Sequence, residues 1–335
     1  MKYKVIHHQR FPFKGQVSIE RLFEEIRDHM PQKWTVEAVI TPCPSKGLLN
    51  RIRNLIHARA QPADVHHIVG DIHYLAFVLP RRKTVLTLHD CATLERLSGL
   101  KRALFKWLWF SGPIRHSHIV TTISHTTKEE LRKWIGTLAN NIVVVPNCIR
   151  SEFLESPKQL NPENPVCLQV GTGWNKNLIR VAEALVGTSC HLEIVGTLNK
   201  TQRATLQELG IGFTELGQVS DSDLVEAYQR CDFLIFASLY EGFGLPILEA
   251  QATGRPVVTS NCSSMPEAAG DGALFVDPES VNDIRQAVDK LLSQPALRED
   301  LIKKGFQNVK KHSPEIVADS YCKLYEQLVK TGHQN

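Results

Sequence analysis

Two glutamates eight positions apart flank a short glycine-rich run in the second half of the chain. The segment reads Ser238-Leu-Tyr-Glu241-Gly-Phe-Gly-Leu-Pro-Ile-Leu-Glu249-Ala250 and follows an apolar run at 233–237. A carboxylate accepts hydrogen bonds at both oxygens, so a glutamate suits the neighbouring hydroxyls of a sugar or a ribose. The two side chains are therefore candidates for holding a ligand that carries more than one diol.

The residues between the glutamates predict a turn that leads into a helix. Gly242 and Gly244 permit a tight turn, and Pro246 suits the first turn of a helix. The unpaired N–H groups and partial positive charge at a helix start favour a phosphate. We expect Glu241 on the loop and Glu249 in the first helical turn, with one carboxylate holding a ribose and the other a transferred sugar.

A second glycine-bearing loop offers a cation. Gly171-Thr-Gly-Trp-Asn-Lys176 follows the apolar run at 166–170. A lysine after a strand is commonly just solvated, so this loop by itself assigns Lys176 no ligand.

The elements that must position these loops recur with one rhythm through both halves of the chain. Short runs rich in Val and Ile alternate with amphipathic segments, as in buried parallel sheets covered by helices. Residues 151–165, with three prolines, interrupt the rhythm as a linker, and residues 280–332 have an almost entirely helical pattern. The length of 335 residues fits two domains. The expected strands are 4–8, 36–40, 65–69, 84–88, 118–122 and 142–145, then 166–170, 191–195, 213–216, 233–237, 256–259 and 273–276.

Composition narrows the class of protein. The chain is 42% hydrophobic and 22% charged, with a net charge of +4 that is too small and too dispersed for a nucleic-acid partner. Eight cysteines without Cys-x-x-Cys pairs indicate free thiols in a reducing compartment. We find no signal peptide and no apolar run of the roughly 20 residues that span a bilayer. We expect a cytoplasmic protein whose contact with a membrane, where one exists, is peripheral.

The run around the two glutamates resembles the retaining family 4 glycosyltransferases, whose hallmark is Glu, seven residues and a second Glu. The resemblance extends through Gly254-Arg-Pro-Val-Val-Thr-Ser260, Pro266-Glu-Ala and Gly272-Ala-Leu-Phe-Val-Asp-Pro278. It implies an α/β protein of GT-B architecture, with two doubly wound Rossmann-like domains facing across a cleft. Residues 1–150 would form the acceptor domain, completed by a C-terminal helix (316–335) that crosses back, and 151–315 the nucleotide-sugar donor domain.

The resemblance also implies roles for individual residues. Glu241, Lys176 and His89 would be catalytic, and His89 ends the expected strand at 84–88. The donor would contact Glu249, Gly242, Phe243, Gly244, Leu245, Val219, Gly171, Thr172 and Gly15. Gly15 belongs to a loop after the first strand, and Val219 to a turn whose main chain would meet the nucleobase.

The resemblance also makes Val170-Gly-Thr-Gly-Trp-Asn-Lys-Asn177 the phosphate-contacting loop, in which Lys176 would neutralise the donor diphosphate and the charge that develops as it leaves. This chain departs from the family in that loop. The family usually places an arginine soon after the strand, where this chain has Thr172 and Gly173. The usual pair of cations is therefore incomplete, or another cation supplies the missing charge.

The expected reaction is retaining transfer of a hexose-type sugar from a UDP-, GDP- or ADP-linked donor to a saccharide or lipid-linked acceptor, in polysaccharide or glycoconjugate biosynthesis. We expect no cofactor and no metal, because the histidines at 66, 67 and 73 lack a coherent set of further ligands. Residues 101–115 mix cations with aromatic side chains; we interpret the aromatics as core, with a membrane-facing surface as the alternative.

Three other classes of function fit parts of the pattern. A nicotinamide-dependent dehydrogenase would use Gly171-Thr-Gly173, but Lys176 stands where its third glycine should be. A nucleotide-sugar-binding protein without turnover is compatible with the missing arginine. A phosphorylase or epimerase of the same architecture is the third, although the chain shows no arginine cluster for a phosphate acceptor.

Overall fold

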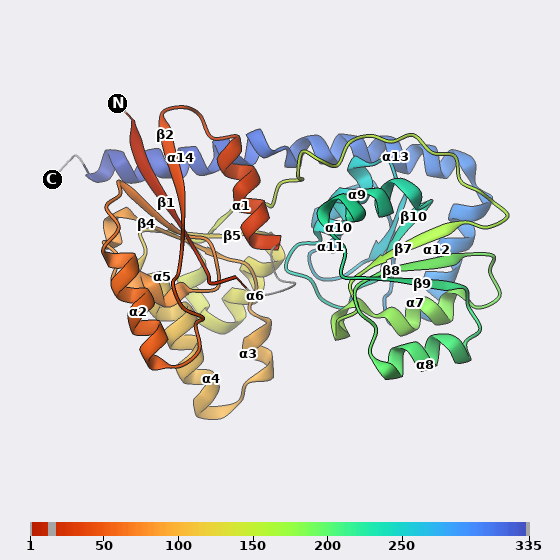
Figure 1. Ribbon diagram of the computed structural model, residues 1–335, viewed down its shortest axis with the longest axis horizontal. Coiled ribbons are helices and arrows are strands. Elements are labelled where there is room, and N and C mark those ends of the chain that lie inside the picture. The colour runs from red at the N-terminus through yellow and green to blue at the C-terminus, as the bar shows by residue number, and fades with distance from the viewer. Residues whose placement is uncertain (1, 13–17, 333–335) are drawn as a thin grey trace. The chain divides into compact units, whose positions relative to one another are not determined.

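The computed structural model describes residues 2–12 and 18–332, and it divides into two compact units (Figure 1). Unit 1 comprises Met1–Cys148 and Pro314–Asn335, and unit 2 comprises Ile149–Ser313. Each unit holds a six-stranded sheet in which all neighbouring strands are parallel. The predicted α/β class with two doubly wound halves is confirmed.

The sheet of unit 1 has the strand order β2-β1-β3-β4-β5-β6. Its strands are β1 (Tyr3–Gln9), β2 (Trp34–Ile40), β3 (Val65–Ile68), β4 (Thr84–Leu88), β5 (Ile119–Thr122) and β6 (Val143–Val144). β3, β4 and β5 are buried along their whole length, which explains the apolar and β-branched sequences of β4 and β5. β3 instead carries two buried histidines, His66 and His67. The order reverses between β1 and β3, which makes the carboxyl ends of these strands the expected place for a ligand.

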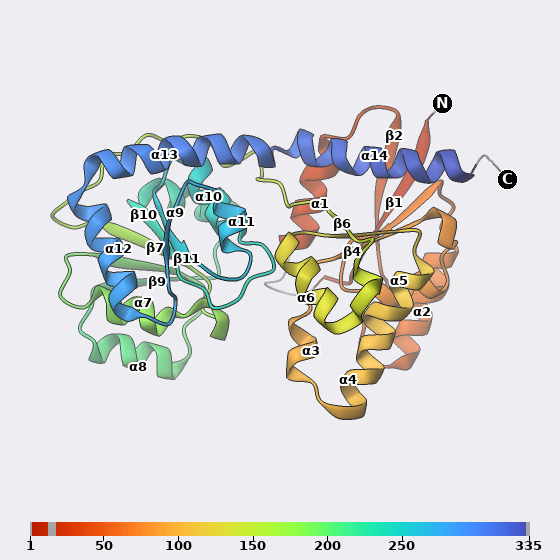
Figure 2. The ribbon, with the colours of Figure 1, turned by 180° about the vertical axis from the view of Figure 1, so that it is seen from behind.

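Helices cover both faces of this sheet (Figures 1 and 2). The α-helices are α1 (Ser18–Asp28), α2 (Leu48–Arg59), α3 (Ala92–Arg96), α4 (Gly99–Lys106), α5 (Gly112–His116), α6 (His125–Ile135) and α14 (Pro314–Gly332). Shorter turns are η1 (His73–Phe77), η2 (Arg81–Lys83), the π-helical η3 (Trp107–Ser111) and η4 (Gly136–Ala139).

The last helix completes the core of unit 1, as predicted. Val317, Tyr321 and Tyr325 of α14 are buried in one cluster with Val5 of β1 and Phe23 of α1. Unit 1 is therefore built from both ends of the described chain.

The sheet of unit 2 has the order β12-β11-β10-β7-β8-β9. Its strands are β7 (Val166–Val170), β8 (His191–Val195), β9 (Phe213–Gly217), β10 (Phe233–Phe236), β11 (Val257–Ser260) and β12 (Leu274–Val276). The order reverses between β7 and β10, so the loops that leave these two strands are neighbours although 65 positions separate Lys176 from Glu241.

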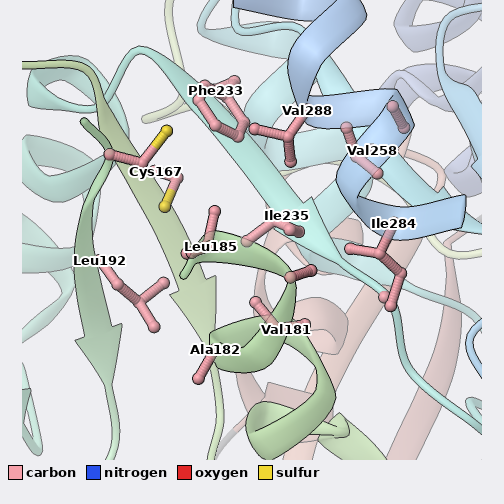
Figure 3. Close-up of a cluster of buried hydrophobic side chains, with 14 of the residues drawn as sticks. Cys167, Val181, Ala182, Leu185, Leu192, Phe233, Ile235, Val258, Ile284 and Val288 are labelled. Atoms are coloured by element: carbon pink, nitrogen blue, oxygen red, sulfur yellow. The ribbon is translucent and has the colours of Figure 1, made fainter. Parts of the chain in front are cut away.

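Seven α-helices flank this second sheet: α7 (Leu178–Leu185), α8 (Lys200–Glu208), α9 (Asp221–Arg230), α10 (Leu245–Ala252), α11 (Met265–Ala269), α12 (Val281–Ser293) and α13 (Pro295–Val309). The short turns η5 (Trp174–Lys176) and η6 (Lys310–His312) complete the unit. Figure 3 shows side chains of α7 and α12, including Val181, Leu185 and Ile284, packed against the strands. Among the described residues, no helix is both long and apolar enough to cross a bilayer.

A chain of buried histidines runs through the core of unit 1. The Tyr325 hydroxyl lies 3.0 Å from His7 Nε2 and 2.7 Å from His67 Nδ1. His8 and His66 form a second pair at 3.1 Å. Burial lowers the pKa of His8 to about 3 and the pKa of His66 to about 4, and it also lowers the pKa values of His7 and His67. These imidazoles are therefore neutral in the folded unit.

This burial predicts that acid destabilises unit 1 selectively. A histidine titrates near pH 6.5 in the unfolded chain, so below that pH the unfolded state binds more protons and the free energy of unfolding falls. Each histidine with a folded pKa of about 4 should cost roughly 1–2 kcal/mol at pH 5. Hydrogen exchange at pH 7.5 and 5.0, corrected for intrinsic rates, should show protection lost in peptides of unit 1.

Unit 2 is the internal control, because its buried Glu249 has a raised pKa and acts with the opposite sign. Equal loss of protection in both units would contradict the prediction.

Candidate active site

Lys176 and Glu241 form an ion pair at the switch point of unit 2. The Nζ of Lys176 donates to Oε1 of Glu241 at 2.7 Å, and the side chains are 19% and 15% exposed. Nδ2 of Asn175 donates to the same oxygen at 3.3 Å and to the carbonyl of Tyr240 at 2.9 Å. The sequence predicted both charged residues, and the structure brings them together on neighbouring strand ends within reach of solvent.

The loop after β7 leaves room for this lysine only because residue 171 is glycine. Gly171 has φ 94°, and a Cβ there would lie 2.8 Å from Cε of Lys176. The lysine also passes over the ring of Phe236, with Nζ 4.5 Å from the ring centroid. Gly171 therefore positions the cation, and its own N–H is used in a 2.7 Å hydrogen bond to the carbonyl of Val195.

Two serines of the loop after β11 hold the loop that carries Glu241. The hydroxyls of Ser263 and Ser264 each donate to the carbonyl of Glu241 at 2.8 Å. The backbone N–H of Glu241 in turn donates to Ser263 Oγ at 3.2 Å. Ser264 also donates to the carbonyl of Phe243. These bonds fix the backbone around Glu241 and leave its carboxylate to the ion pair.

The start of α10 presents unused backbone donors. Gly244 has φ 115° and ends the turn directly before the helix. Within the part of the chain that the structure describes, the N–H groups of Phe243, Gly244 and Leu245 form no hydrogen bond. Such a cluster of donors at a helix start can bind an anion. The Phe243 side chain is buried and packs against His312, so only its backbone is available.

Glu249 lies one turn further along α10 than we expected. The helix begins at Leu245, which puts Glu249 in its second turn and leaves it 7% exposed. The Tyr228 hydroxyl donates to Glu249 Oε2 at 2.7 Å, and Nη2 of Arg150 lies 3.8 Å from Oε1. The carboxylate is thus held from two sides by groups that the sequence analysis did not single out.

Burial and charge act in opposite directions on Glu249. Burial raises the pKa of its carboxyl, while Arg150 and the hydrogen bond from Tyr228 lower it. Burial and the neighbouring carboxylate also raise the pKa of Tyr228, so its hydroxyl stays protonated and acts as the donor.

Arg150 connects Glu249 to the segment that follows β9. Its Nη1 lies 3.0 Å from Asp221, the first residue of α9, and 2.6 Å from Glu152. Because Arg150 belongs to the unit's first residues, outside any strand or motif, no spacing in the sequence pointed to it. It is a cation beside Glu249, although it does not stand in the loop after β7, where the resemblance led us to expect an arginine.

Thr172 lies in the loop after β7, and Val219 lies in the turn after β9. The Thr172 hydroxyl donates to the carbonyl of Thr197 at 2.9 Å, so its proton is already used. Val219 is half-buried in the turn between β9 and α9, where Ser220 caps the helix. Both assignments stay predictions. Gly242 lies between Glu241 and Phe243 in the same loop, and Gly15 falls outside the described residues.

In unit 1, His89 directly follows β4. Its Nε2 lies 2.8 Å from the carbonyl of Val69, and burial lowers its pKa to about 4. A carbonyl only accepts, so Nε2 carries the proton and Nδ1 has a free lone pair. A neutral His89 can therefore accept a hydrogen bond from a hydroxyl. Among the described residues, no group of three or more His, Cys, Asp or Glu side chains could hold a metal.

The two halves of the chain match two family models. Residues 20–153 match "Glycosyltransferase Family 4", and residues 151–308 match "Glycosyl transferases group 1". The second match includes Lys176, Glu241 and Glu249.

Two curated relatives are similar over part of their length. The O-antigen chain mannosyltransferase B of Escherichia coli is 39% identical over 34% of this chain and 30% of its own. The N,N'-diacetylbacillosaminyl-diphospho-undecaprenol alpha-1,3-N-acetylgalactosaminyltransferase of Campylobacter jejuni is 31% identical over 52% of this chain and 48% of its own. This chain therefore spans less than half the length of either relative.

Solved structures share the fold over nearly the whole chain. The Anabaena protein HepE, solved in complex with UDP and glucose, aligns with a TM-score of 0.77 at 15% identity, covering 97% of this chain and 100% of that one. At this identity the likeness establishes architecture alone, and the predicted GT-B fold is confirmed.

The close fit of Gly171 against Lys176 predicts an energetic coupling. An added Cβ would displace the lysine from Glu241, so Gly171→Ala and Lys176→Met should be non-additive in unfolding free energy by about 0.5–3 kcal/mol. Gly187→Ala is the matched control: it has a similar φ of 75°, but its Cβ would meet no atom within 4 Å. Urea unfolding of the single and double variants measures the coupling of Lys176→Met with Gly171→Ala and with Gly187→Ala. Additive unfolding free energies for Gly171→Ala and Lys176→Met would contradict the prediction.

Proposed function

We propose that this chain, a GT-B protein similar to glycosyltransferase family 4, is a retaining glycosyltransferase that uses a nucleotide-diphosphate sugar. The observation that carries the proposal is the Lys176–Glu241 pair beside the unused N–H groups at the start of α10. One small region thus offers a cation and backbone donors for a diphosphate, and a carboxylate for sugar hydroxyls.

Each group has a task in holding the donor. Both contacts to Glu241 use Oε1, so we assign Oε2 to the hydroxyls of the transferred sugar. The N–H groups of Phe243, Gly244 and Leu245 would bind the diphosphate, and we assign Oε1 of Glu249 to the ribose. Tyr228 and Arg150 would then fix the orientation of Glu249.

The proposed step forms one bond and breaks one on the same face of the sugar. The acceptor oxygen bonds to the anomeric carbon while the bond from that carbon to the diphosphate oxygen breaks. The acceptor's proton passes to the departing phosphate oxygen, so no side-chain base is required. The protein contributes positioning and charge stabilisation, and Lys176 would bind the phosphate more strongly as negative charge develops.

In this proposal His89 acts only as a hydrogen-bond acceptor. Its Nε2 proton is committed to Val69, so the lone pair on Nδ1 would accept a hydrogen bond from a sugar or acceptor hydroxyl. A pKa of about 4 keeps it neutral above pH 5, which predicts no loss of this contact across the physiological range.

The names of the relatives support a substrate class. They describe transfer of mannose in an O-antigen chain and of N-acetylgalactosamine to an undecaprenol-linked saccharide. We therefore propose a hexose-type sugar and a saccharide or lipid-linked acceptor, in polysaccharide or glycoconjugate biosynthesis. Eight free cysteines support a cytoplasmic setting, and we propose that neither a metal nor another cofactor takes part.

A second candidate is a protein that binds nucleotide sugars without turnover. Two observations favour it: the loop between β7 and α7 holds no arginine, and Lys176 is already paired with Glu241. Turnover separates the two candidates, because both predict binding.

The test is a thermal-shift screen with UDP-, GDP- and ADP-sugars, followed by incubation of the stabilising donor with lipid-linked saccharides in EDTA. A donor at 100 times its Kd should add about 2.7 kcal/mol to the free energy of unfolding. We expect a product whose anomeric configuration, read by NMR, equals that of the donor. Inverted product would contradict the retaining step, a need for divalent cations would contradict metal independence, and binding without product would favour the second candidate.

Substitutions of Lys176 and Glu249 should change different kinetic constants. Lys176→Met should lower kcat about 10²–10³-fold, because its interaction strengthens in the transition state. Glu249→Gln should raise the donor KM about tenfold with a smaller effect on kcat, since the ribose contact is the same in ground and transition states. Lys200→Met, an exposed lysine of α8, is the control and should behave as wild type. Unchanged kinetics in Lys176→Met would remove the proposed catalytic cation.

A further inference from the structure

A hollow opens at the amino edge of the sheet in unit 1. It has a volume of 540 Å³, which is the size of a small-molecule site. Its lining residues come from 59–63 and 77–83, which precede β3 and β4, and from the start of β3. His89 follows the opposite end of β4, and five residues of strand span roughly 17 Å. The hollow is therefore separate from the site at the carboxyl ends of the strands.

The charged side chains of this hollow have one sign. Arg59 and Lys83 line it, and none of the lining residues that the structure describes is acidic. The Nζ of Lys83 donates to the carbonyl of Ala63 at 3.1 Å, which holds the ammonium between the two segments. Arg59 and the adjoining Arg81 and Arg82 are exposed and form no ion pair with any described residue. Cations gathered in this way repel one another, so a bound anion would be stabilised among them.

A buried imidazole forms the inner wall of the hollow. His66 is 3% exposed, and its Nδ1 lies 3.1 Å from Nε2 of His8. His66 is in register with Ile6, and His8 lies two residues further along β1, so Nδ1 faces the carboxyl side of the sheet. The other nitrogen, Nε2, therefore points away from His8, on the side where His66 lines the hollow. It forms no hydrogen bond within residues 2–12 and 18–332, so it is available to a ligand.

The pairing of His8 with His66 allows this nitrogen to act as a donor. Burial, and to a smaller extent the charge of Lys83, lowers the pKa of His66 to about 4, so its ring is neutral. When His8 donates its Nε2 proton, Nδ1 of His66 accepts, and the single proton of His66 then lies on Nε2. An oxygen anion accepts a hydrogen bond from that N–H. Binding of an anion would therefore select this tautomer.

Apolar side chains, among them Phe77 and Leu79, complete the wall. The ring of Phe77 stacks on Trp107, with centroids 5.5 Å apart, and meets His116 edge-on at 5.1 Å, so its position is fixed. Trp107 is itself 51% exposed, so the prediction that the aromatics of 101–115 fill the core is wrong for this residue. An aromatic ring held beside cations suits a ligand that carries both a ring and a negative charge.

We propose that this hollow binds a small soluble phosphate ester. Its phosphate would contact Arg59, Lys83 and Nε2 of His66, and its ring would lie against Phe77. A phosphate monoester has three terminal oxygens, which matches one guanidinium, one ammonium and one imidazole donor. The site lies apart from the Lys176–Glu241 pair, so the proposal goes beyond sugar transfer and does not depend on it.

The test is calorimetric titration with phenyl phosphate, inorganic phosphate and phenol. Phenyl phosphate should bind, inorganic phosphate should bind more weakly because it lacks the ring, and phenol should not bind. Arg59→Gln, whose side chain makes no described contact, should raise the Kd of phenyl phosphate about tenfold, and Arg59→Gln/Lys83→Gln about a hundredfold. Long-range proton–nitrogen NMR spectra of the complex should show His66 neutral with its proton on Nε2.

The matched control is Lys303→Gln/Lys310→Gln, which removes two exposed cations of unit 2 and should bind phenyl phosphate as wild type does. Lys176→Met should also retain this binding, because the hollow does not include the loop after β7. The proposal is overturned if phenyl phosphate does not bind, if inorganic phosphate binds equally well, or if the control or Lys176→Met loses as much affinity as Arg59→Gln. Binding to vesicles of phosphatidic acid without binding to phenyl phosphate, or a complex with the His66 proton on Nδ1, would also overturn it.

Discussion

The ion pair between Lys176 and Glu241 depends on one property of the second sheet, namely the reversal of strand order between β7 and β10. Parallel strands that leave a sheet on either side of such a reversal send their loops in opposite directions and open a crevice between them. The lysine loop and the glutamate loop are the two sides of that crevice. Glycine at 171, the serines at 263 and 264 and the turn at Gly244 all serve to hold these loops in place.

The Glu249 carboxylate is held in place by polar side chains rather than by the geometry of its loop. A carboxylate that is 7% exposed must be paired, and here a tyrosine hydroxyl and a guanidinium share the task. The longer Arg150 contact gives the Oε1 side a weaker partner than the Oε2 side. An oxygen that is oriented but incompletely satisfied is well suited to a ligand hydroxyl, since binding completes its hydrogen bonding.

The two α/β halves could be predicted from the sequence because the periodicity of apolar residues and the residue composition both reflect burial. The apolar and β-branched runs of β4 and β10 indicated buried strands, and the glycines and proline after β10 indicated a turn into a helix. Contacts between distant segments that belong to no motif could not be predicted from the sequence. Arg150 meets Glu249 across 99 positions, the helical turn of Glu249 depended on where α10 begins, and the His89 tautomer depended on the carbonyl of Val69. The exposure of Trp107 also needed the structure, because its neighbours Trp109 and Phe110 are truly buried.

Helix α14 gives the order of synthesis a physical meaning. Tyr321 and Tyr325 fill the centre of unit 1, so the segment made first cannot close its core until residues beyond 325 have been translated. Unit 2, whose strands and helices all lie between Ile149 and Ser313, has everything it needs earlier. On the ribosome unit 2 would therefore fold before unit 1, although most of unit 1 is synthesised earlier. Until α14 has been made, the apolar strands of unit 1 would remain exposed, and chaperones bind such exposed apolar segments.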